Sequence, residues 1–198
     1  MSAGPVETEI KLRITDAAAG LGLIALVGAL PKTGRLFEAN MVYDTVACEI
    51  RGRGELLRLR EVGDRCVLTW KGPGSAGKHK SREETEVLIS DAGGFDLILR
   101  RLGFTPMFRY EKYRTEFGIR DQAGVITLDE TPIGCFLELE GPPQWIDRCA
   151  AALGFSVADY LTLSYLSLNQ EECLKRGVAV SDMVFRQEED RRQASDGE

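Results

Sequence analysis

Charged side chains occupy every second position in several short segments of this sequence. Glu7, Glu9 and Lys11 alternate with Thr8 and Ile10, so that ionic and less polar residues fall on opposite sides of an extended chain. Successive side chains of a β-strand point to opposite faces, and the pattern therefore predicts a strand with one ionic face. The same alternation recurs in Leu57-Arg58-Leu59-Arg60, Lys112-Tyr113-Arg114, Thr127-Leu128-Asp129 and Glu138-Leu139-Glu140. One such face is ordinary at a solvated edge, whereas so many favour a shared ionic surface.

Two sets of charged residues on these faces could do chemistry together. The basic set is Lys11, Arg58, Arg60, Lys71, Arg82, Lys112 and Arg114. The acidic set is Glu7, Glu9, Asp129, Glu138 and Glu140. Clustered cations repel one another unless an anion joins them, and arginine and lysine both bind phosphate oxygens. Carboxylates are the oxygen ligands that Mg²⁺ or Mn²⁺ prefers, and such a cation bridges carboxylates and phosphate. The two sets predict a site for a triphosphate and a divalent cation.

The elements that position these residues are about eight strands with three or four helices. Strands are expected over residues 6–14, 36–46, 55–60, 65–71, 82–89, 109–117, 125–130 and 133–140. Helices are expected after Asp16 as far as Gly28, over residues 92–102, from Pro142 to Leu153, and over residues 157–168. If the sheet closes into a barrel, alternation directs one set of faces into its interior. The apolar faces then point outward and require amphipathic helices as cover.

Length and composition predict a single domain and exclude several functions. The 198 residues are 43% hydrophobic and 28% charged, which is ordinary for one globular domain. A formal charge of −6 argues against general nucleic-acid binding, which needs a basic surface. We expect the domain to span residues 1–185, and residues 186–198 to form a charged, disordered tail.

Cysteine usage and hydropathy indicate a cytoplasmic protein. The five cysteines form no CxxC pair, and with a single histidine they are interpreted as reduced packing residues. The apolar stretch from Ala17 to Leu30 follows acidic residues and is too short to span a bilayer. A core-facing helix and no membrane partner are expected.

Seven charged segments also follow one another in a recognisable order. They are Glu7-Thr8-Glu9-Ile10-Lys11, Tyr43-Asp44-Thr45, Leu57-Arg58-Leu59-Arg60, Leu68-Thr69-Trp70-Lys71-Gly72-Pro73, Arg82-Glu83-Glu84, Glu111-Lys112-Tyr113-Arg114 and Phe136-Leu137-Glu138-Leu139-Glu140. Together they resemble the motifs of the CYTH superfamily, the triphosphate tunnel metalloenzymes, from about residue 6 to residue 168. The resemblance implies an α+β fold built on an eight-stranded antiparallel β-barrel, or tunnel, with flanking helices.

The resemblance also implies a role for each charged position. Glu7, Glu9, Asp129, Glu138 and Glu140 match the metal-binding carboxylates of the family. Lys11, Arg58, Arg60, Arg82 and Arg114 match its phosphate-binding residues. Lys71 and Lys112 match tunnel lysines that transfer a proton or stabilise the leaving group, and which of the two is catalytic stays open. A homodimer is compatible with the resemblance, and the sequence does not demonstrate one.

The family includes enzymes of three kinds, and departures from their motifs help to choose among them. Val42 and Leu56 stand where animal thiamine triphosphatases carry a tyrosine and a tryptophan, which argues against that specificity. The His-Phe pair that precedes the motif of residues 7–11 in enterobacterial class IV cyclases is missing, and Gly4-Pro5 occupies its neighbourhood. This departure argues against cyclase activity. The first hypothesis is therefore metal-dependent hydrolysis of inorganic or nucleoside triphosphate. The alternatives are cyclisation of ATP to cyclic AMP and a non-catalytic module that binds polyphosphate or nucleotide.

Other conspicuous residues receive structural interpretations. Trp70, Trp145 and the phenylalanines at 104, 108 and 155 are expected to pack in the core or between helix and barrel. His79 is expected to be exposed in a loop. Glu84 and Glu86 are interpreted either as a further metal site or as partners that hold the arginines in place.

Overall fold

Antiparallel strands that close on themselves form the centre of the computed structural model, which describes residues 4–75 and 77–185. The strands are β1 (Val6–Ile14), β2 (Leu30–Pro31), β3 (Leu36–Thr45), β4 (Leu56–Val62), β5 (Arg65–Lys71), β6 (Lys80–Ile89), β7 (Phe104–Gly118), β8 (Val125–Thr131) and β9 (Gly134–Glu140). The α-helices are α1 (Ala17–Leu26), α2 (Glu49–Gly52), α3 (Ala92–Arg101), α4 (Pro143–Ala152) and α5 (Tyr165–Arg176). The expected tail at residues 186–198 lies outside the described residues.

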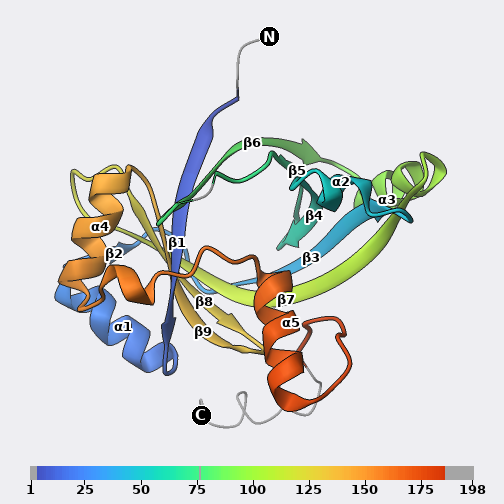
Figure 1. The fold of residues 1–198 in the computed structure, drawn as a ribbon. Coiled ribbons are helices and arrows are strands. Elements are labelled where there is room, and N and C mark those ends of the chain that lie inside the picture. The colour runs from blue at the N-terminus through green and yellow to red at the C-terminus, as the bar shows by residue number, and fades with distance from the viewer. Residues whose placement is uncertain (1–3, 76, 186–198) are drawn as a thin grey trace, which may run out of the picture.

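The barrel closes through the long strand β7. The strands follow the order β7-β3-β4-β5-β6-β1-β9-β8, and β8 pairs again with β7 (Figure 1). The first residues of β7 pair with the end of β3, and its last six residues pair with β8. The expected eight-stranded antiparallel β-barrel with flanking helices, an α+β fold, is confirmed. The two-residue strand β2 is an addition that pairs with β7 outside the ring of eight.

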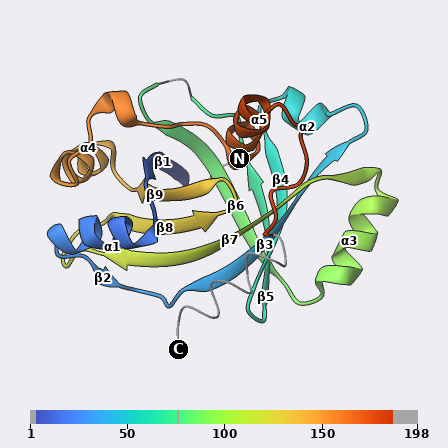
Figure 2. The same ribbon diagram turned by 90° about the horizontal axis from the view of Figure 1, so that it is seen from below.

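Alternation along the strands directs apolar residues outward, as β1 illustrates. Ile10 and Leu12 are fully buried on its outer face, where α1 and α4 cover the barrel (Figure 2). Ile24 of α1 and Ile146 of α4 complete this cluster together with the outer residues of β8 and β9. The helices thus supply the cover that the apolar strand faces require, and Asp16 caps α1 as expected.

Two other helices cover the rest of the barrel. Leu99 of α3 packs on Tyr43 and Leu59, outer residues of β3 and β4. Helix α5 lies at another side, where Leu168 packs with Phe108 and Phe136 (Figure 1). Burial of Phe108 confirms the packing interpretation for that residue.

The helix predicted over residues 157–168 is wrong. The chain forms one 3-10 turn at Val157–Asp159, and then runs extended to Ser164. Leu161 exchanges two backbone hydrogen bonds with Lys11, with N···O distances of 2.8 and 2.9 Å. Because these bonds use groups that a helix would need internally, the helix begins only after Ser164, whose side chain caps α5.

The strand predicted over residues 109–117 begins earlier, at Phe104. This extension includes Pro106, which has no backbone N–H for a ladder. A register shift between Val42 and Tyr43 of β3 accommodates it, since Val42 pairs with Phe108 and Tyr43 pairs with Pro106. The short helix α2 was also missed, because four residues carry no detectable periodicity.

All five cysteines are free, which confirms their interpretation as unpaired residues. No helix in residues 4–75 and 77–185 is both long and apolar enough to cross a membrane.

Candidate active site in the barrel

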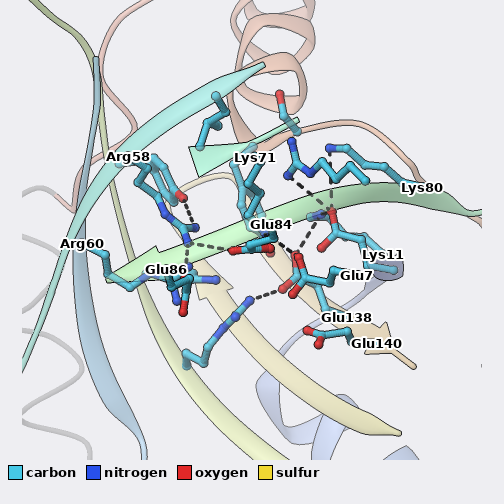
Figure 3. Close-up of a pocket in the computed structure, with 18 of the residues that line it drawn as sticks. Glu7, Lys11, Arg58, Arg60, Lys71, Lys80, Glu84, Glu86, Glu138 and Glu140 are labelled. Carbon is cyan, nitrogen blue, oxygen red and sulfur yellow. Dashed lines mark hydrogen bonds and ion pairs between the residues drawn. The ribbon is translucent and has the colours of Figure 1, made fainter. Parts of the chain in front are cut away.

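The inner faces of the strands enclose a cavity of about 530 Å³ (Figure 3). Eight basic residues line it: Lys11, Arg58, Arg60, Lys71, Lys80, Arg82, Lys112 and Arg114. Seven glutamates line it as well: Glu7, Glu9, Glu84, Glu86, Glu116, Glu138 and Glu140. These residues come from six strands, and Ser164 and Tyr165 of the α5 region complete the wall.

The structure brings the sequence-predicted residues together with one exception. All seven basic residues and four of the five carboxylates line the cavity. Asp129 is fully buried and is not among the lining residues. The ionic faces of Arg58, Lys112 and Glu138 thus converge on one enclosed space.

A first group of contacts joins β1, β6 and β9. Lys11 and Glu138 are cross-strand partners, and Lys11 Nζ lies 2.9 Å from Glu138 Oε1. Lys11 Nζ also lies 3.5 Å from Glu9 Oε1, and Lys80 Nζ approaches the same oxygen to 3.7 Å. Burial raises the pKa of the Glu138 carboxyl, but Lys11 and Arg114 reverse this effect and hold it well below its usual range. Glu138 is therefore ionised and available as an oxygen ligand.

A second group places two carboxylates against one lysine, with Glu140 beside them. Lys71 Nζ lies 2.6 Å from Glu7 Oε2 and also contacts Glu84. Burial, followed by the hydrogen bond to Glu7, raises the pKa of Glu84 to about 7. Burial and the charge of Glu7 raise the pKa of Glu140 to about 8. Carboxylates placed this close share protons unless a cation lies among them.

These carboxylates match in kind what a hard divalent cation binds. Glu7 and Glu84 both contact Lys71, and the charge of Glu7 acts on Glu140, so three oxygen-donor side chains lie near one another. Among residues 4–75 and 77–185, no group of three or more histidine, cysteine, aspartate or glutamate side chains is arranged to hold a metal ion. Lys71 occupies the space between Glu7 and Glu84. A cation bound there would displace this ammonium group toward the rest of the cavity.

Arg58 of β4 and Arg82 of β6 have unused donors. Arg58 donates to Tyr110 Oη at 3.2 Å and to Thr69 Oγ1 at 3.0 Å. The Nε groups of Arg58 and Arg82 are buried and have no hydrogen-bond partner among the described residues. Buried donors without a partner are costly. An anion in the cavity would satisfy them.

Sequence reasoning missed Lys80 and Glu38. Burial, followed by the charge of Lys11, lowers the pKa of Lys80 to about 8. Its alternation with Arg82 along β6 was the available signal. Glu38 Oε1 lies 3.5 Å from Arg60 Nη1, and Glu38 Oε2 lies 3.5 Å from Lys112 Nζ. Glu38 stands in a mixed segment without charge alternation, so only the fold reveals its place.

Glu84 and Glu86 both contact Arg58, at 4.0 and 3.5 Å from its Nη2 atom.

His79 was expected to be exposed, and this is wrong: its side chain is 8% exposed, and its Nε2 atom lies 2.8 Å from Asp147 Oδ1 of α4. The loop folds against the helix, which a local sequence pattern cannot show. Trp145 is 4% exposed and packs between α4 and the barrel, as expected.

Comparisons with known proteins agree with this architecture. The family model described as the CYTH domain matches residues 6–144. A protein of Methanocaldococcus jannaschii with the provisional name adenylate cyclase is 31% identical over 140 residues, which cover 68% of this chain and 76% of that protein.

Solved structures show the same fold. A Pyrococcus horikoshii protein superposes with a TM-score of 0.70 at 25% identity, over 84% of this chain and 99% of its own. A Hippeastrum protein, provisionally named an adenylyl cyclase and described as revealing a dominant triphosphatase activity, has a TM-score of 0.61 at 19% identity, over 87% of this chain and 97% of its own. On the family match and the 31% identical relative, the chain belongs to the CYTH domain family.

Proposed function

We propose that this protein is a divalent-metal-dependent enzyme that binds a triphosphate inside its barrel and hydrolyses it to release phosphate. The observation that carries the proposal is the cavity of about 530 Å³, lined by eight cations and seven carboxylates. The buried unpartnered Nε groups of Arg58 and Arg82 add donors that point to an anionic ligand.

The basic residues bind the phosphates and stabilise the charge of the transition state. Lys11, Arg58, Arg60, Arg82 and Arg114 hold the phosphate oxygens, where fixed cations in an enclosed site act more strongly than in water. Lys71 and Lys112 stabilise the oxygen that leaves the terminal phosphorus. A water oxygen attacks that phosphorus in line, the bond to the bridging oxygen breaks, and the water loses a proton to solvent.

The carboxylates supply the metal site. Glu7, Glu9, Glu138 and Glu140 would hold Mg²⁺ or Mn²⁺, which supplies Lewis-acid neutralisation of phosphate charge when it is bound. Neutralisation by these carboxylates also limits the repulsion among the lining cations before substrate arrives.

Cyclisation of ATP to cyclic AMP with release of pyrophosphate is the alternative, and the provisional name of the M. jannaschii relative favours it. It would use the same phosphate and metal residues, with the ribose hydroxyl as nucleophile in place of water. The Hippeastrum protein carries a cyclase name and a dominant triphosphatase activity, so in that protein the name does not describe the main reaction.

Product identification separates these functions. Purified protein is incubated with tripolyphosphate, ATP or thiamine triphosphate in the presence of Mg²⁺ or Mn²⁺, and phosphate, pyrophosphate and cyclic AMP are quantified. Release of phosphate that requires the metal supports hydrolysis. Formation of cyclic AMP with equimolar pyrophosphate would instead show that the protein is an adenylyl cyclase. Binding without turnover of any of the three compounds would leave a non-catalytic binding module.

A further inference from the structure

Asp129 of β8 differs from the other predicted metal carboxylates in its surroundings. Its exposed fraction is 0%, and it is not among the residues that line the cavity. The other four carboxylates of the predicted set line the cavity. Asp129 therefore lies behind the wall that a bound triphosphate would touch.

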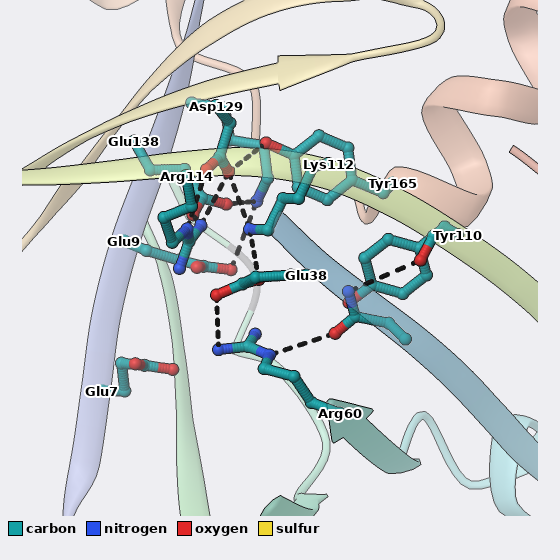
Figure 4. Close-up of polar contacts among 12 residues, drawn as sticks. Glu7, Glu9, Glu38, Arg60, Tyr110, Lys112, Arg114, Asp129, Glu138 and Tyr165 are labelled. Atoms are coloured by element: carbon teal, nitrogen blue, oxygen red, sulfur yellow. Dashed lines mark hydrogen bonds and ion pairs between the residues drawn. The ribbon is translucent and has the colours of Figure 1, made fainter. Parts of the chain in front are cut away.

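The carboxylate of Asp129 already accepts four hydrogen bonds (Figure 4). Arg114 donates from Nε to Oδ1 at 2.7 Å and from Nη2 to Oδ2 at 2.6 Å. Lys112 Nζ donates to Oδ2 at 2.8 Å, and Tyr165 Oη donates to the same oxygen at 2.6 Å. A carboxylate offers about four acceptor positions. Oδ2 accepts three of these four bonds and Oδ1 accepts one, so a metal ion could reach this fully buried carboxylate only through the remaining position of Oδ1.

Two of these donors belong to residues that line the cavity. Lys112 and Arg114 lie two residues apart on the inner face of β7, and Arg114 pairs directly with Asp129 across the β7–β8 ladder. Asp129 thus contacts both cationic groups from their buried side. A contact of this kind fixes the direction of each side chain, as carboxylates commonly do behind the ligands of active sites.

Tyr165 fixes Asp129 in turn. It is the first residue of α5, and its ring also lies beneath two cations, with Lys11 Nζ and Lys112 Nζ each 5.2 Å from the ring centroid. The segment after α5 pairs with the barrel, because Met183 exchanges backbone hydrogen bonds with Arg109 and Glu111 of β7, and Asn169 of α5 donates a hydrogen bond to Ser181 O of that segment. The Tyr165 hydroxyl therefore has a fixed position from which to orient the carboxylate.

We propose that Asp129 and Tyr165 are positioning residues that hold Lys112 and Arg114 toward the bound triphosphate, and that Asp129 does not ligate the metal. The inference rests on the proposed function, since it concerns how the same cavity grips its substrate. It assigns to α5, outside the barrel, a part in substrate binding.

The test separates triphosphate binding from metal binding. Calorimetry measures tripolyphosphate binding in the presence of a chelator, and the electron paramagnetic resonance of Mn²⁺ measures binding of the metal alone. The variants are Tyr165→Phe and Asp129→Asn, with Glu138→Gln as the metal-site reference. Tyr43→Phe is the matched control, because Tyr43 also donates a 2.6 Å hydrogen bond to an aspartate, Asp96, on the outer side of the barrel.

We expect Tyr165→Phe and Asp129→Asn to weaken tripolyphosphate binding by about tenfold, as loss of an orienting partner commonly does. Their Mn²⁺ binding should stay within about twofold of wild type, whereas Glu138→Gln should weaken it by at least about tenfold. Tyr43→Phe should change neither quantity. Tyr165→Phe removes a single oxygen atom, so it reports on the pair even if Asp129→Asn folds poorly.

Three outcomes would overturn these assignments. If Asp129→Asn weakens Mn²⁺ binding as much as Glu138→Gln does, Asp129 is a metal ligand. If Tyr165→Phe binds tripolyphosphate as tightly as Tyr43→Phe does, Tyr165 serves packing alone. A wild-type protein that binds no tripolyphosphate would contradict the proposed function itself, and the inference would fail with it.

Discussion

Lys11 and Glu138 face each other across the β1–β9 ladder, with Nζ and Oε1 separated by 2.9 Å inside the barrel. The pair combines the two kinds of charge that the proposed reaction needs, a cation for phosphate and a carboxylate for metal. Glu9 lies beside it, with Oε1 3.5 Å from the same Lys11 Nζ atom. This compact arrangement makes single substitutions informative.

Glu9→Gln should abolish metal-dependent turnover and leave the fold intact. Burial raises the pKa of Glu9, but the charges of Lys11, Lys71 and Lys80 together lower it, so the wild-type side chain is held in its ionised form. The amide is a poorer ligand, and we expect kcat to fall by about 100-fold or more. Turnover is measured with Mg²⁺ and Mn²⁺, and folding by circular dichroism. Glu130→Gln, which changes an exposed contact to Arg35, is the control. Unchanged turnover in the Glu9 variant counts heavily against the metal assignment.

Arg58→Lys should raise the KM for tripolyphosphate more than it lowers kcat. The guanidinium of Arg58 donates to Tyr110 and Thr69 and keeps its Nε group without a partner among the described residues. A lysine ammonium cannot reproduce this planar set of donors. A loss of about tenfold in affinity is expected for a lost bidentate phosphate contact. Steady-state kinetics separates the two constants. An Arg53→Lys variant changes an exposed arginine outside the cavity and should match wild type.

Ile24→Ala should destabilise the protein by about 2–4 kcal/mol, because it opens a space between α1 and the barrel. Ile24 is 2% exposed within the cluster that covers β8 and β9. Leu26→Ala on the same helix is the matched control, since Leu26 is 76% exposed and its truncation should cost less than about 0.5 kcal/mol. Urea unfolding provides both values. Equal effects of the two substitutions would mean that α1 does not cover the barrel as described.

Glu38 should make stability depend on pH in the acid range. Burial raises its pKa, but Lys112 and Arg60 reverse this and lower it to about 2. Because the unfolded carboxyl binds its proton at a higher pH than the folded one, the stabilisation is complete above about pH 4.5 and is lost as the pH falls toward 2. This corresponds to on the order of 3 kcal/mol.

Glu38→Gln removes this titration, so its free energy of unfolding should fall less steeply with acid than that of wild type. Denaturant unfolding at a series of pH values between 2 and 6 measures the difference. Parallel curves for the two proteins would show that Glu38 is not held in its ionised form by Lys112 and Arg60.

Strand periodicity in the sequence predicted most of the barrel and the residues inside it. The alternation in residues 6–14 and 133–140 places Glu9 and Glu138 on one face because side-chain direction has a period of two along any strand. That rule is local, and it holds whichever strands become neighbours. The family resemblance of the ordered motifs predicted that the barrel closes, because alternation alone is equally compatible with an open sheet.

Long-range pairing decided the remainder. Asp129 and Glu138 both belong to strands with alternating charge, yet one is enclosed by four hydrogen bonds and the other lines the cavity. The difference arises from Tyr165, which lies 36 residues from Asp129 in the chain. Tyr165 begins helix α5, which follows the segment in which Leu161 pairs with Lys11. Residue type and spacing determine which side of a strand a charge occupies. What a side chain meets there depends on neighbours that only the closed barrel brings into contact.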